Sequence, residues 1–188
     1  DIEMNDAKAT TTANGCLNAI YRMVVSIGKQ SKNNKYEVLV NIEEKVHEIL
    51  INSLEPRFQD VHESVLTCIG AFAYYATEIS SKLWEIFPKL VLLLHHNIEK
   101  TSEYGLVSPG ITAIMNYMQK DPETFIDVNM PSGETPFSAV VTLISKTITE
   151  ANECDDHLFH KTGTDLVIGL LENLHGKIDD SIPSIIEL

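Results

Sequence analysis

Apolar side chains recur along the chain at the three- and four-residue spacing of amphipathic α-helices, in about eight successive segments. The first segment, residues 12–28, ends at Gly28, a typical C-terminal stop. Its apolar positions are Leu17, Ile20, Tyr21, Val24 and Ile27. Residues 1–8 lack this periodicity and are expected to form a loop or a frayed end. No segment alternates apolar and polar residues as a strand would, so the pattern predicts an all-α protein.

The second and third segments lie on either side of a helix break at Glu55-Pro56. The apolar positions of the second are Leu39, Ile42, Val46, Ile49 and Leu50. The third covers residues 58–76 and predicts one helix of more than five turns. Its apolar positions are Phe58, Val61, Val65, Ile69, Phe72 and Ala76.

The fourth segment follows a helix-capping signal, Ser80-Ser81 with Glu85 nearby. Its apolar positions are Leu83, Trp84, Phe87, Leu90, Val91 and Leu94, and Trp84 is expected to belong to the core. An interior proline costs about 3 kcal/mol in an isolated helix. Pro88 therefore predicts a kink or a helix held by neighbours on several sides.

The later segments are less regular. Val107, Ile111, Ile114 and Met118 predict a helix around the Ser108-Pro109-Gly110 tripeptide, which lies either inside that helix or at its start. Residues 121–136 contain three prolines and predict an irregular acidic loop, after which residues 137–148 are helical again. A final pair of helices is expected, the first from near residue 155 to a close at Gly176 and the second over residues 178–188.

These segments pair into four hairpins, over residues 10–55, 57–98, 104–150 and 155–188. Units of about 45 residues are typical of HEAT and armadillo repeats. The sequence thus predicts a single fragment of an α-solenoid with about four HEAT-type helical hairpins. The chain opens without Met and its last apolar pattern is still running at Leu188, so we expect a larger parent protein.

The net charge of -13 is unevenly distributed along the chain. Residues 1–120 hold 14 acidic and 11 basic side chains, whereas residues 121–188 hold 13 acidic and 3 basic ones. Such a surface disfavours nucleic acid and anionic lipid and favours basic proteins, although it also fits a merely solubilising face.

Acidic residues gather at two places. Glu43, Glu44 and Glu48 lie opposite or beside the apolar stripe of the second helix, which predicts a solvated surface that could also contact a basic partner. Others lie in the loop 121–136, and loops on a rigid scaffold often carry recognition. The acidic residues that we expect to contact a protein partner are Glu44, Glu48, Asp121, Glu123, Asp127 and Glu134.

The sequence lacks the signatures of an enzyme, so we expect no catalytic residue and no cofactor. It has no GxGxxG, GxxxxGK[ST], GxSxG or HExxH motif. The scattered cysteines Cys16, Cys68 and Cys154 argue against a disulfide scaffold, and Cys68 is expected to act as a small apolar residue. No apolar run approaches the roughly 20 residues of a membrane span, and we expect a soluble, intracellular chain.

One local cluster has metal-ligating residue types. Asp155, Asp156, His157 and His160 lie close together, and the two histidines share a helix face. Zinc needs three or four ligands of fixed geometry, and no further group with suitable spacing accompanies them. An acidic helix N-terminus is the better interpretation, and we expect no metal site.

Several segments resemble the C-terminal half of importin-β-type karyopherins, in particular the branch that contains importin-7 and importin-8. They are the run LNAI at residues 17–20, residues 63–68 with the helix that follows, the run LWEIFP at residues 83–88, and Ile182-Pro183. The resemblance extends over nearly the whole chain as a register of helices and loops. The acidic, proline-containing loop 121–136 departs from the animal members of this family.

The resemblance implies a transport receptor that shuttles between cytoplasm and nucleus and binds basic cargo proteins. It also implies binding of the GTPase Ran and of nucleoporins through the parent protein, with cargo release on Ran-GTP binding. The alternative is a HEAT-repeat scaffold or regulatory subunit that needs no Ran. An all-α enzyme is a third class, for which the sequence offers no convergent polar residues.

Overall fold

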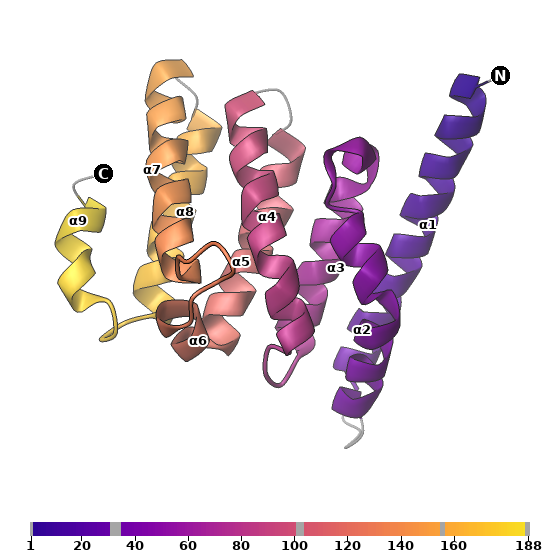
Figure 1. Cartoon of the computed structure of the whole chain (residues 1–188), viewed down its shortest axis with the longest axis horizontal. Coiled ribbons are helices and arrows are strands. Elements are labelled where there is room, and N and C mark those ends of the chain that lie inside the picture. The colour runs from indigo at the N-terminus through magenta and orange to yellow at the C-terminus, as the bar shows by residue number, and fades with distance from the viewer. Residues whose placement is uncertain (1, 31–34, 101–103, 155–156, 187–188) are drawn as a thin grey trace.

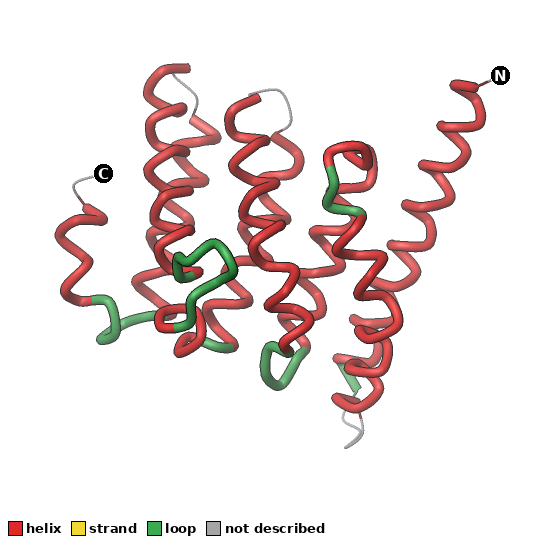
Figure 2. Tube along the Cα trace, viewed as in Figure 1, coloured by secondary structure: helices red, strands yellow, loops and turns green. Residues whose placement is uncertain are grey.

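The computed structural model describes residues 2–30, 35–100, 104–154 and 157–186. Within these residues the protein is all-α and contains no strand, as predicted (Figure 2). The α-helices are α1 (Ile2–Gly28), α2 (Lys35–Asn52), α3 (His62–Tyr75), α4 (Ser81–Lys100), α5 (Tyr104–Lys120), α6 (Pro122–Asp127), α7 (Pro136–Cys154), α8 (His157–Asn173) and α9 (Ile182–Ile186). Two short 3₁₀ helices, η1 (Pro56–Val61) and η2 (Asp179–Ser181), precede α3 and α9.

The helices follow one another along the longest axis of the molecule, from α1 at one end to α9 at the other (Figure 1). α1 contacts α3, α3 contacts α5, and α5 contacts α8, so these four helices form one layer. α2 contacts α4 and α4 contacts α7, which forms a second layer. Contacts between α1 and α2, α3 and α4, α4 and α5, and α7 and α8 join the two layers.

The core lies between the layers and follows the apolar stripe of each helix. α3 and α5 approach closely at Gly70, where an added Cβ would lie 3.6 Å from the Cα of Ala113. The Asn116 side-chain amide donates a hydrogen bond to the Gly70 carbonyl oxygen at 2.9 Å. Two small residues thus let the α3 and α5 backbones pack closely, and Asn116 satisfies a carbonyl group at the contact.

Three of the predicted helix boundaries are wrong. The helix expected over residues 178–188 begins only at Ile182, because Asp179–Ser181 forms the 3₁₀ helix η2. Residues 1–8 are predicted to form a loop or a frayed end, but α1 is helical from Ile2. No proline lies between Ile2 and Gly28, and a helix can continue without an apolar stripe. The predicted helix 58–76 is divided, because Phe58 has non-helical dihedral angles (φ -110°, ψ 28°) within η1 and α3 begins only at His62. Phe58 is exposed, so its apolar side chain did not mark a helix face.

Both interior prolines lie inside helices. α4 continues through Pro88 and packs against α2, α5 and α7, which fits the predicted support by neighbours. α5 begins at Tyr104 and continues through Pro109, so the Ser108-Pro109-Gly110 tripeptide lies inside the helix rather than at its start.

The segment 121–136, predicted to be an irregular loop, is only partly irregular. Its first half forms α6, with Asp121 as N-cap and Pro122 in the first turn, two residue types that favour a helix start. The remaining residues, 128–135, form the loop between α6 and α7 (Figure 2). The three prolines of this segment predict a loop, whereas Pro122 occupies the first turn of a helix, where proline is favoured. None of the described helices is long and apolar enough to cross a bilayer.

Candidate functional site

The contact between α2 and α4 is made by polar side chains that the predicted apolar stripe of α2 does not include. The buried residues of α2 are Leu39, Glu43, Val46, His47 and Leu50. Ile49, predicted to face the core, is half exposed, and Ile42 is only partly buried. Glu43 completes the 39, 43, 46, 50 spacing of one helix face, so this spacing could have identified it as a buried residue.

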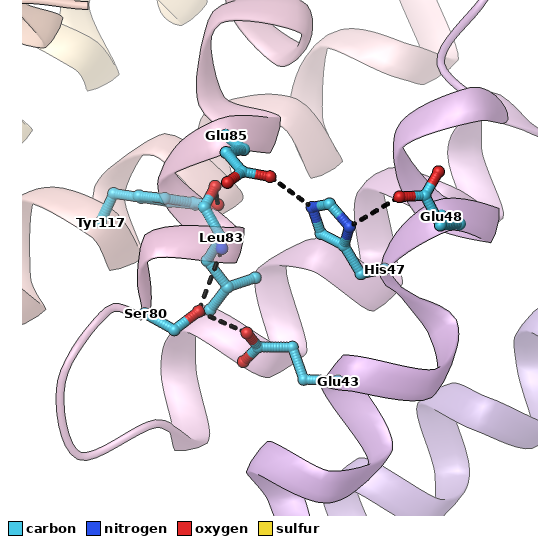
Figure 3. Close-up of polar contacts among 7 residues, drawn as sticks. All are labelled: Glu43, His47, Glu48, Ser80, Leu83, Glu85 and Tyr117. Atoms are coloured by element: carbon cyan, nitrogen blue, oxygen red, sulfur yellow. Dashed lines mark hydrogen bonds and ion pairs between the residues drawn. The ribbon is translucent and has the colours of Figure 1, made fainter.

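Glu43 from α2 meets Ser80, the residue immediately before α4 (Figure 3). The Ser80 hydroxyl donates a hydrogen bond to Oε1 of Glu43 and accepts one from the backbone N–H of Leu83 at 3.1 Å. The second bond caps the first turn of α4, which confirms the capping signal at Ser80-Ser81. One hydroxyl group thus fixes the start of α4 and joins α4 to α2.

Glu43 is a buried carboxyl group. It is 5% exposed, although its place beside Glu44 predicted a solvated surface. Burial raises the pKa of Glu43, while the Ser80 hydrogen bond and the charges of His47 and Lys82 oppose that rise. No lysine or arginine forms an ion pair with Glu43 among the described residues. Burying a carboxylate this way costs folding free energy, and the hydrogen bond to Ser80 offsets only part of it.

His47 lies one turn further along α2 and is 6% exposed. Its Nδ1 is 3.7 Å from Oε1 of Glu48, and its Nε2 is 3.4 Å from Oε2 of Glu85 on α4 (Figure 3). The contact with Glu85 does not have hydrogen-bond geometry, so the buried Nε2 has no hydrogen-bond partner among the described residues. The imidazole therefore lies between carboxylates of two helices, an arrangement that the sequence did not reveal because Glu85 is distant along the chain.

Tyr117, on α5, contacts the same first turn of α4 that Ser80 caps. Its side chain is fully buried, and its hydroxyl donates a hydrogen bond to the carbonyl oxygen of Leu83 at 2.7 Å (Figure 3). Burial raises the pKa of Tyr117, and the nearby charge of Glu43 adds to that rise. Tyr117 is thus held as a neutral phenol that ties α5 to the first turn of α4.

A small pocket of about 190 Å³ opens between α2 and the connection from α3 to α4. Glu43 and Ser80 form part of its wall, together with Glu37 and Val40 of α2 and Glu78 of the connection. Tyr36 and Val40 are about half exposed, at 41% and 49%. The pocket therefore combines carboxylates with apolar surface that is open to solvent.

A wider groove of about 560 Å³ crosses the layer formed by α1, α3 and α5. Its wall includes Tyr21, Tyr74, Tyr75, Pro109 and Asn116. Tyr74 is 52% exposed and packs edge-on against Tyr75, with ring centroids 4.8 Å apart. The groove offers aromatic surface to a partner, but it carries little of the negative charge of the chain.

The acidic residues predicted to contact a partner do not form a single surface. Glu44 and Glu48 are exposed on α2, whereas the other four lie on or beside α6, which contacts α5 and α7 and lies apart from α2 (Figure 1). Glu123 and Asp127 are exposed on α6, and Glu134 is exposed in the loop that follows. Glu123 pairs with Lys177, so its charge is partly compensated.

Asp121 has a structural role that the sequence analysis did not foresee. Its Oδ1 accepts a hydrogen bond from the Thr124 backbone N–H at 3.2 Å, and its Oδ2 accepts one from the Trp84 indole N–H at 3.0 Å. Trp84 is partly buried against the core, as expected, and its polar edge is satisfied by this carboxylate. With both oxygens engaged inside the molecule, Asp121 is less available to a partner than Asp127, which is exposed at the end of α6.

The remaining candidate chemistry concerns a metal site and a reactive thiol. No group of three or more histidine, cysteine, aspartate or glutamate side chains that could hold a metal ion occurs within the described residues. Asp155 and Asp156 lie outside the described residues, and so does the side chain of His157. Cys68 is buried, as predicted, and burial raises the pKa of its thiol to about 12, so it stays protonated.

Comparison of the chain with protein-family models, with curated protein sequences and with solved structures finds no match.

Proposed function

We propose that this chain is a segment of an α-solenoid that binds a basic protein partner. The observation that carries the proposal is the order of helix contacts, α1 to α3 to α5 to α8 in one layer and α2 to α4 to α7 in the other. In a solenoid each helix packs mainly on its neighbours in the stack, and an elongated surface remains for a partner.

The charge of the chain supports a basic partner. A net charge of -13 favours the approach of a basic protein, chiefly through the rate of association. Glu44, Glu48 and Glu85 contribute exposed carboxylates on α2 and α4. Asp127 and Glu134 contribute further ones near α6.

We further propose that the parent protein is a nuclear transport receptor of the importin-β type. This part of the proposal is supported by the resemblance of residues 83–88 to that family. Three residues of this run are fully buried and serve packing: Leu83, Ile86 and Phe87. Contacts with a partner would therefore come from exposed side chains elsewhere.

A binding experiment tests the basic-partner proposal. A lysine- and arginine-rich peptide should bind the chain, more weakly as ionic strength rises, and a glutamate-rich peptide of the same length should not bind. Reversing charge with Glu44→Lys and Glu48→Lys should weaken binding by about fivefold. Equal binding of the two peptides would contradict the proposal.

A second experiment separates a transport receptor from a HEAT-repeat scaffold. The parent protein is loaded with a basic cargo protein, and Ran locked in its GTP form is added. Release of the cargo supports a transport receptor, whereas cargo that stays bound favours the scaffold.

A further inference from the structure

We propose that the pocket beside Glu43 receives one lysine or arginine side chain of the protein partner, held by Glu37, Glu43 and Glu78. This inference rests on the proposed function, because it assigns a specific contact to a basic partner. It goes further by naming the site, the residues and the kind of side chain.

The size of the pocket fits a single side chain. Its volume of about 190 Å³ lies below the roughly 300–1,000 Å³ of pockets that bind small molecules. The opening lies between α2 and the connection before α4, where Tyr36 and Val40 are about half exposed. A side chain that projects from a partner could therefore enter without any movement of the helices.

The chemistry of the wall fits a side chain with an aliphatic stem and a cationic end. Three carboxylates line the pocket, and no lysine, arginine or histidine of the described residues belongs to its wall. Val40, which is 49% exposed, offers apolar surface to the methylene groups, which lysine and arginine commonly bury while their charge stays in a polar setting. The Tyr36 ring is already engaged by Lys35, whose Nζ lies 4.9 Å from the ring centroid, so the carboxylates are the groups assigned to hold the cationic end.

Lys35, which contacts the Tyr36 ring, and Lys82 leave Glu43 without an ion pair among the described residues. Lys35 donates a hydrogen bond to the Gly28 carbonyl oxygen at 3.4 Å. Lys82 acts on Glu43 through its charge but forms no ion pair with it among the described residues. Glu43 is thus a carboxyl group, 5% exposed, for which Ser80 is the one hydrogen-bond donor that the described residues provide.

The burial of Glu43 carries an energetic cost that a partner could remove. A buried carboxylate without a cation destabilises the free protein, and a cation delivered by a partner would offset that cost only in the complex. A residue that serves binding at the expense of stability has a recognisable signature: its neutral variant binds less tightly and folds more stably. A purely structural Glu43 would not show these two effects together.

The test uses N-acetyl-arginine methylamide and N-acetyl-lysine methylamide as probes, with the citrulline compound as an uncharged control. Backbone amide signals of residues 36–43 and 76–80 should shift on addition of either cation, and not on addition of citrulline. Glu43→Gln should weaken binding of the cations about tenfold and raise the midpoint of thermal unfolding. Glu172→Gln, exposed on α8 and outside the pocket wall, is the matched control and should change affinity by less than about twofold.

Two results would overturn the inference. One is an equal response to citrulline and to the cations, and the other is unchanged affinity in Glu43→Gln together with the double variant Glu37→Gln, Glu78→Gln. If the basic peptide binds the chain while the probes leave the pocket signals unchanged, the pocket assignment fails and the proposed function stands. If the probes bind and the peptide does not, the proposed function fails and the pocket remains a cation site.

Discussion

Two contacts made by α4 use a carboxyl group in opposite ways. Near α6, Asp121 accepts hydrogen bonds on both oxygens, from Thr124 and from Trp84. Near α2, Glu43 is more deeply buried, yet Ser80 is its one donor among the described residues, and it lines a pocket. Burial alone therefore does not make an acidic residue structural. The number of donors that its oxygens find inside the molecule is the better guide.

The side chains around Asp121 are well packed and hydrogen-bonded, whereas those around Glu43 include an unsatisfied polar group. Asp121 borders an aromatic cluster in which Trp84 and Tyr117 have ring centroids 5.0 Å apart, and Phe87 and Phe125 have centroids 5.6 Å apart. Glu43 borders His47, whose buried Nε2 finds no hydrogen-bond partner in the described part of the chain. The contact near α6 is therefore built for stability, whereas the contact near α2 keeps polar groups that are not fully satisfied.

Removing the aromatic cluster should have the largest effect. Phe87 is fully buried and contacts the rings of Trp84, Tyr117 and Phe125. Phe87→Ala should lower the free energy of unfolding by about 3–5 kcal/mol, because it leaves a cavity between α4, α5 and α6. Chemical denaturation measures this change. Phe87→Leu, which fills more of the space, should lose less, and equal losses in both variants would contradict the cavity argument.

Removing the Asp121 carboxyl group should have the next largest effect. Asp121→Ala should lower the free energy of unfolding by about 2 kcal/mol, because α6 loses its N-cap and the Trp84 indole N–H loses its acceptor. Asp121→Asn keeps an acceptor oxygen and should lose about half as much. Denaturation followed by the fluorescence of Trp84, the single tryptophan, reports both variants. Full stability of Asp121→Ala would show that the two hydrogen bonds contribute nothing net.

The sequence predicts the helices better than it predicts these two contacts. Repeating apolar positions located the long helices, and the Ser80-Ser81 signal located the start of α4. They could not show that Trp84 donates to Asp121 or that His47 faces Glu85, since each pair lies 37 or 38 positions apart and meets only after the helices pack. Charge alone favoured a solvated Glu43, whereas its 39, 43, 46, 50 spacing favoured burial, and the spacing was the better guide.

The smallest predicted effect has the opposite sign. Glu43→Gln should raise the free energy of unfolding at pH 7 by about 1 kcal/mol, because the amide keeps an acceptor for Ser80 and carries no charge to bury. Burial raises the pKa of Glu43 above its ordinary value of 4.5 in the folded protein. Protonation of Glu43 therefore contributes to the stability of the folded protein. The contribution is complete at a pH below the pKa of Glu43 in the unfolded chain, and it is lost as the pH rises through the higher pKa in the folded protein.

The difference in stability between wild type and Glu43→Gln should consequently shrink as the pH falls from 7 toward 4.5. Glu44→Gln, at an exposed position of the same helix, should show a smaller and flatter difference. A Glu43→Gln variant that is less stable than wild type at pH 7 would mean that the carboxylate is well stabilised where it lies, and the contrast with Asp121 would disappear.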